Sequence, residues 1–152
     1  MLVLREGLLN LVTSDLWLVV SLKINAMSFG NFTDLKVYKK CRIFRKWVSK
    51  IVKQYFPKNE QYLLTAQILD ASRSITANIA EGYGRHYYQD NMKFCRYSKG
   101  SLAETLEHLI TAFDENYIST EILEDGKKQH DECMKLLNGY INYLEKSKSN
   151  KK

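Results

Sequence analysis

The chain has 152 residues, of which 45% are hydrophobic and 26% are charged, and its net charge is +6. This composition predicts one soluble folded domain rather than two domains or a chain that is disordered as a whole. Seven Gly and one Pro are too few turn residues for a many-stranded sandwich, so long helices are expected. The cysteines, Cys41, Cys95 and Cys133, have neither disulfide nor zinc spacing, which predicts a reducing, cytoplasmic compartment. No metal and no cofactor are expected.

The first 26 residues are apolar but carry four charges, Arg5, Glu6, Asp15 and Lys23. Their uncharged run from Leu16 to Leu22 is far shorter than a membrane span, so no membrane association is expected. Met27 begins a stretch that reads like a natural start, which favours interpreting residues 1–26 as a mis-assigned upstream extension. A loosely attached helix and, last, a signal peptide are the alternatives.

Four amphipathic segments follow, and their apolar periodicity predicts helices over residues 35–55, 60–80, 89–114 and 120–146. Thr33 or Asp34 is expected to cap the first helix. The predicted fold is all-α, an up-down-up-down antiparallel four-helix bundle over residues 27–146, followed by a polar tail, residues 147–152, that frays.

The predicted helix 35–55 has one apolar face and one almost purely basic face. Residues 27–60 carry nine Lys or Arg against two acidic residues, a net charge of +7, whereas residues 61–152 carry a net charge of −1. The basic excess therefore belongs to one element. The residues expected to contact nucleic-acid phosphates there are Lys36, Lys39, Lys40, Arg42, Lys46, Lys50 and Lys53.

Other side chains extend this predicted interface. Trp47, at the edge of the basic arc, offers a ring for stacking on an unpaired base. A second, weaker basic group comprises Arg73, Arg85, Lys93, Arg96 and Lys99. The alternative interpretation is a protein-interaction scaffold whose basic face serves only solubility or an acidic protein partner.

The predicted helix 60–80 has apolar or small residues on two sides, which indicates more than one neighbour. Gly82 and Gly84 are expected to end it. Gly100, in the middle of the third helix, costs about 1 kcal/mol relative to Ala, which the close approach of another backbone would justify. These features predict a homo-oligomer, with contacts at Tyr62, Ala66, Leu69, Ala77, Ala80 and Gly100.

Three segments carry a family resemblance. They are Ser74–Arg85 (SITANIAEGYGR), Asp34–Tyr38 (DLKVY) and Gly100–Glu104 (GSLAE). Together they resemble the bacterial 23S rRNA intervening sequence proteins, over about residues 29–146. The resemblance implies a homopentameric four-helix bundle. The family is also similar to the accessory variability protein of diversity-generating retroelements, which implies nucleic acid and a reverse transcriptase as possible partners.

The sequence offers little catalytic chemistry. His130 and Cys133 have i, i+3 spacing, but both lie on an apolar stripe, which favours a core role over a metal site. Arg85 and His86 are adjacent, so the Arg-spacer-His motif of helical-bundle ribonucleases is absent. Glu81 and Glu104 are expected to bind Arg or backbone amides, although a carboxylate pair stays open. We therefore expect no enzyme.

Overall fold

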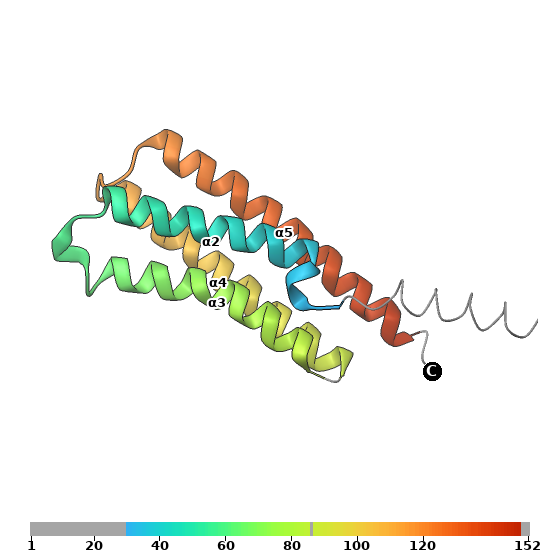
Figure 1. Ribbon diagram of the computed structural model, residues 1–152. Helices are drawn as coiled ribbons and strands as arrows, with labels where there is room; N and C mark the ends of the chain where they lie inside the picture. The colour runs from blue at the N-terminus through green and yellow to red at the C-terminus, as the bar shows by residue number, and fades with distance from the viewer. Residues whose placement is uncertain (1–29, 86, 150–152) are drawn as a thin grey trace, which may run out of the picture. The chain divides into compact units, whose positions relative to one another are not determined.

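The computed structural model describes residues 30–85 and 87–149, and the unit that begins at Phe32 is a helical bundle. Its long helices are α2 (Lys36–Tyr55), α3 (Leu64–Gly84), α4 (Tyr88–Asp114) and α5 (Thr120–Ser149), with the short 3-10 helices η1 (Phe32–Asp34) and η2 (Lys58–Glu60) before α2 and α3 (Figure 1). No strand occurs in the described ranges. The all-α prediction is confirmed. The predicted extension, residues 1–26, and the start at Met27 lie outside the described residues.

Contacts join α2 to α3, α3 to α4, α4 to α5 and α5 back to α2. Successive helices of the bundle run in opposite directions in Figure 1. For example, Lys40 pairs with Glu132 of α5, whereas Trp47, further along α2, meets the earlier residue Gly126. Adjacent helices are therefore antiparallel, which is consistent with the up-down-up-down order.

The core is filled by the apolar stripes that the periodicity indicates. Fully buried side chains come from all four helices and include Phe44, Ile75, Leu102 and Leu137. Leu35, before α2, is also buried. The prediction that Thr33 or Asp34 caps α2 is wrong. The N-cap is Leu35, which has an extended backbone and a buried side chain, and Asp34 belongs to η1.

The boundaries of α3 differ most from the prediction. The helix begins at Leu64 rather than Glu60, because Glu60 ends η2 and its Oε2 accepts a hydrogen bond from the backbone N–H of Leu64 at 3.1 Å. It ends at Gly84 rather than Ala80. Gly82 thus does not terminate α3; it is a buried helical residue.

Of the described glycines, Gly82 has the least space for a side chain, because α3 and α4 approach each other closely there. A Cβ at residue 82 would lie 2.9 Å from the Phe94 Cβ and 3.0 Å from the Asn91 carbonyl oxygen. Gly100, by contrast, is exposed and has open space at its Cβ position. Among the described residues no backbone approaches Gly100 closely, whereas Gly82 makes such an approach; the prediction that Gly100 contacts another copy of the chain stays a prediction.

The end of α5 also departs from the prediction. The helix continues to Ser149, so residues 147–149 are helical rather than part of a frayed tail. Ser147 and Ser149 donate their hydroxyls to the carbonyls of Tyr143 and Glu145, which fits polar residues into the last turns without breaking the helix. Within the described ranges no helix has the length and hydropathy needed to cross a membrane.

Candidate nucleic-acid interface

Five cations of α2 form a straight row on the side of the helix opposite the core. At 3.6 residues per turn they fall within an arc of about 80° and extend over about 21 Å. We call this row the outer stripe; its residues are Lys39, Arg42, Lys46, Lys50 and Lys53, all exposed. Helix α2 contains no acidic residue. Among the described residues, none lies in an ion pair with a stripe cation, so the stripe presents uncompensated positive charge.

The core anchors the opposite side of α2. Phe44 and Val48 are fully buried there, and Ile51 and Val52 nearly so. Because the stripe cations lie on the other side of the cylinder, their charge is separated from the packing that forms the helix. Lys36 is also exposed, about 40° from the edge of the stripe.

Two further cations of α2 point sideways to neighbouring helices. Lys40 makes an ion pair with Glu132 of α5, and this contact holds the pKa of the Glu132 carboxyl below its usual value. Arg45 donates from Nη1 to the buried Thr76 hydroxyl of α3 at 2.7 Å. The prediction of Lys40 as a phosphate contact is weakened accordingly, because its ammonium group is already used within the fold.

Trp47 is a packing residue in this structure. Its ring stacks on the buried Phe44 with centroids 6.0 Å apart, and its edge faces α5, where a Cβ at Gly126 would lie 3.2 Å from the ring atom Cη2. The half-buried ring is thus engaged between α2 and α5. Its interpretation as a platform for an unpaired base is revised for this reason.

The second basic group is largely compensated by carboxylates. Arg73 lies 3.5 Å from Asp70, Arg85 pairs with Glu81, and Arg96 lies 3.6 Å from Glu145. The Arg85 guanidinium also lies over the Phe94 ring, and the Lys93 ammonium over the Tyr97 ring. These cations are not brought together into one positive surface, so the outer stripe is the stronger candidate.

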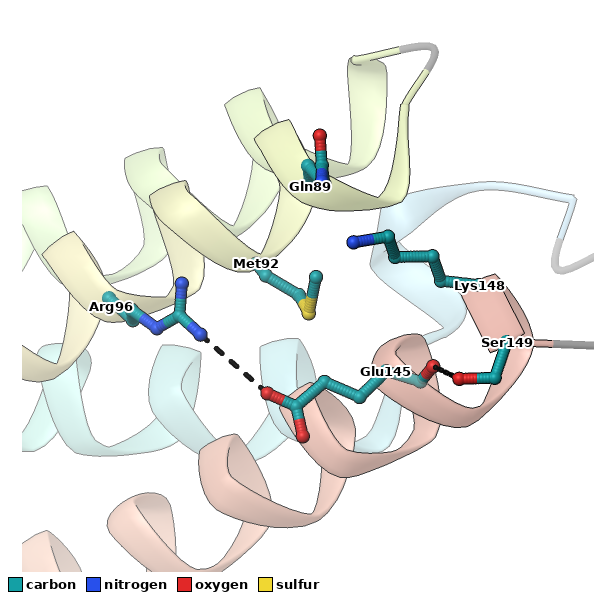
Figure 2. Close-up of a pocket in the computed structure, with 6 residues that line it drawn as sticks. All are labelled: Gln89, Met92, Arg96, Glu145, Lys148 and Ser149. Atoms are coloured by element: carbon teal, nitrogen blue, oxygen red, sulfur yellow. Dashed lines mark hydrogen bonds and ion pairs between the residues drawn. The ribbon is translucent and has the colours of Figure 1, made fainter.

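A cleft of about 640 Å³ lies between the start of α4 and the end of α5 (Figure 2). Its lining residues are Gln89, Met92, Arg96, Glu145, Lys148 and Ser149. Figure 2 shows Arg96 reaching across to Glu145, whose carboxylate compensates the guanidinium. With Lys148 as its only other charged group, the cleft carries less positive charge than the outer stripe, and we assign it no phosphate-binding role.

The cysteines and histidines that the structure describes do not assemble a reactive centre. All three cysteines are free and buried. The hydrogen bond to Cys133, and then burial, raise the pKa of Cys41, while burial raises the pKa of Cys95 to about 11. His130 is buried beside Asp131, at 2.9 Å. Within the described ranges no cluster of three or more His, Cys, Asp or Glu could hold a metal.

Among the described residues no contact joins Glu81 to Glu104, so the two do not form a carboxylate pair. Glu81 binds Arg85 one turn later, and Glu104 lies 3.8 Å from His108 one turn later. The buried Nε2 of His108 has no hydrogen-bond partner among the described residues. Both carboxylates thus have partners four residues later in the chain, and the partner of Glu81 is an Arg, as the sequence led us to expect.

The predicted self-association residues fall on two helices and one turn. Ala66, Ala77 and Ala80 lie on the side of α3 away from its core stripe, with Ala77 exposed and the other two half-buried. Leu69 is half-buried and packs against the core. Tyr62 is 85% exposed but belongs to the turn before α3. Gly100 is on the exposed face of α4. The six residues therefore do not form a single patch. The alanines on the outer side of α3 are the ones that share one face.

Two polar residues of the stripe region were missed by the sequence reasoning. Ser49 and Gln54 line a shallow depression together with Lys46, Lys50 and Lys53. Helical spacing alone places both residues on the basic side of α2, so the sequence could have identified them. Uncharged side chains of this kind can donate hydrogen bonds to phosphate oxygens between the cations.

Comparisons with known proteins place this bundle in context. Residues 33–139 match the family described as 23S rRNA-intervening sequence protein. A solved structure from Bacteroides thetaiotaomicron, described as a protein with unknown function from the S23 ribosomal protein family, is 25% identical; the match covers 69% of this chain and 97% of that chain, with a TM-score of 0.64. No curated protein gives a significant match.

Proposed function

The chain belongs to the 23S rRNA-intervening sequence protein family, and we propose that it is a non-enzymatic bundle that binds the phosphates of RNA or DNA through α2. The observation that carries this proposal is the outer stripe: five exposed cations in line, with no carboxylate partner among the described residues. Lys36 extends the same surface.

Phosphate binding by such a surface is driven by counterion release. Lys and Arg neutralise phosphates, and the ions that were condensed on the nucleic acid enter solution. A surface built only for solubility needs neither alignment nor the exclusion of acidic residues, because mixed charges serve that purpose. Helix α2 has eight Lys or Arg and no Asp or Glu. This one-sided composition favours an anionic partner.

The test is a charge reversal at Lys46, Lys50 and Lys53, each changed to Glu. Because these side chains are exposed and make no ion pair within the described ranges, the melting temperature should change little. Affinity for a generic oligonucleotide should fall at least about a hundredfold at low salt, since three attractions become repulsions. Binding is measured by fluorescence anisotropy over a series of salt concentrations.

A matched control has the same change of charge on another helix. Lys128, Lys135 and Lys146 lie on the exposed face of α5, away from its core stripe. Reversing these three to Glu alters the net charge equally, but it should lower affinity far less. Equal losses in the two variants would mean that net charge alone governs binding. Unchanged binding in the α2 variant would refute the proposal and favour the protein-interaction scaffold.

We also propose that the protein is a homo-oligomer, a pentamer as the family resemblance implies, which contacts its copies through the outer side of α3. The exposed Ala77 and half-buried Ala80 would let another helix approach closely. Ala77→Glu should dissociate the assembly while leaving the helical signal intact, because Ala77 is outside the core. Light scattering at micromolar concentration measures the mass. A monomeric mass for the wild type would refute self-association.

A further inference from the structure

The outer stripe has a length that can be compared with nucleic-acid backbones. Its five cations extend over about 21 Å of helix. A duplex presents one phosphate charge per about 1.7 Å of its axis, and a single strand at the same rise presents one per about 3.4 Å. Over that length a duplex carries about twelve phosphate charges and a single strand about six, so the duplex sets up the stronger negative potential beside the stripe.

The cations of the stripe are also held at fixed spacing. Helix α2 is uninterrupted from Lys36 to Tyr55 and has neither Gly nor Pro. It is anchored in the core by Phe44 and Val48, and at its sides by the Lys40–Glu132 ion pair and the Arg45–Thr76 hydrogen bond. A rigid cation row suits a rigid phosphate array, whereas a single strand must lose conformational freedom to follow it.

Proteins that prefer single strands recover this entropic loss by stacking bases on aromatic rings. The described side chains of α2 offer no such ring on the stripe. Trp47 is turned towards Gly126, and Tyr38 packs against Phe32 with centroids 4.9 Å apart. The exposed apolar residue beside the stripe is Ile43, which is 57% exposed but aliphatic. A base placed here would gain no stacking energy.

From these three features we infer that the ligand of the outer stripe is the phosphate backbone of a double-stranded nucleic acid rather than a single strand. This inference rests on the proposed function and adds the class of nucleic acid. The stripe consists of Lys and Arg side chains carried on a rigid helix, without a set of amide or carboxylate side chains aimed at base edges, so recognition should be independent of sequence.

The experiment compares three labelled probes of equal length, about 20 nucleotides per strand: an RNA duplex, a DNA duplex and an unstructured single strand of uridines. Anisotropy titrations with the full chain are run at several salt concentrations. We expect the two duplexes to bind at least about tenfold more tightly than the single strand at low salt. The salt slope for a duplex should approach −0.9 for each phosphate neutralised, about −4 to −5 for the whole stripe.

A gain-of-function variant tests the reason for the preference. Ile43→Trp places a ring at the edge of the stripe, on an exposed position that contributes no core packing. It should raise single-strand affinity several-fold and leave duplex affinity nearly unchanged, because stacking on one base contributes about 1–3 kcal/mol. Failure of this variant to improve single-strand binding would overturn the argument from the missing ring.

The outcomes separate the inference from the proposed function. Duplex binding that exceeds single-strand binding and is lost in the Lys46, Lys50 and Lys53 variant supports both. Single-strand binding equal to or tighter than duplex binding overturns the inference and leaves phosphate binding in place. Absence of binding to all three probes overturns the proposed function itself.

Discussion

Gly82 provides the sharpest test of the packing between α3 and α4. In the interior of an exposed helix, Gly→Ala stabilises by about 1 kcal/mol, because alanine has the higher helix propensity. At Gly82 the added methyl would lie 2.9 Å from the Phe94 Cβ and from the Asn91 Oδ1, and 3.0 Å from the Asn91 carbonyl oxygen. Two of these three atoms are fixed to the α4 backbone, so the clash can be relieved only by separating the helices.

Overpacking of this kind costs about 1–3 kcal/mol. After the propensity gain of about 1 kcal/mol is subtracted, Gly82→Ala should lower the free energy of unfolding by up to about 2 kcal/mol. Gly139→Ala is the matched control, because residue 139 is in the middle of α5, exposed, with open space at its Cβ position. That variant should gain about 1 kcal/mol.

Urea unfolding followed by far-UV circular dichroism measures both values. The two variants should thus differ in stability by about 1–3 kcal/mol, with Gly82→Ala melting several degrees below Gly139→Ala. A Gly82→Ala protein that gains as much stability as Gly139→Ala would refute the close approach of the two helices.

Two further predictions concern groups buried between helices. Arg45→Met keeps the apolar stem but removes the 2.7 Å hydrogen bond to Thr76. The free energy of unfolding should therefore fall by about 1 kcal/mol. A decrease smaller than the experimental error of urea titrations would contradict this prediction. Burial raises the pKa of Cys95 from 9.0 to about 11, so the unfolded thiol ionises first as the pH rises and unfolding becomes more favourable. The stabilisation linked to the Cys95 thiol is therefore complete below pH 9.0 and is lost as the pH rises towards 11. The free energy of unfolding falls by at most about 1.4 kcal/mol per pH unit in this interval. Wild type should lose more stability over this interval than Cys95→Ala, and parallel stability curves would exclude the effect.

The sequence predicts the bundle well because its apolar periodicity is strong and long. The four helices, their order and most of their core positions follow from that periodicity alone. The errors lie at the helix ends and at glycines. Gly82 and Gly100 look equivalent in the sequence, and only the position of α4 shows that the first meets a neighbouring backbone and the second does not.

The charge of the candidate interface was predictable from the sequence, but the contacts that its residues make with neighbouring helices were not. Helical spacing places Lys39, Lys46 and Lys53 on one side without any structure. It cannot show that Lys40 reaches Glu132, or that Trp47 fits against Gly126, because both contacts depend on which helix lies beside α2. The same limit applies to Arg96 and Glu145, which are 49 residues apart in the chain and 3.6 Å apart in space.

The separation between the two sides of α2 has a consequence for how this protein can change. Substitutions at Phe44 or Val48 alter the packing of the bundle, so selection for folding acts on them directly. Substitutions within the outer stripe leave those contacts untouched. The charge of the stripe can therefore be gained, lost or inverted over evolutionary time while the bundle stays the same, and relatives with this fold need not share its ligand.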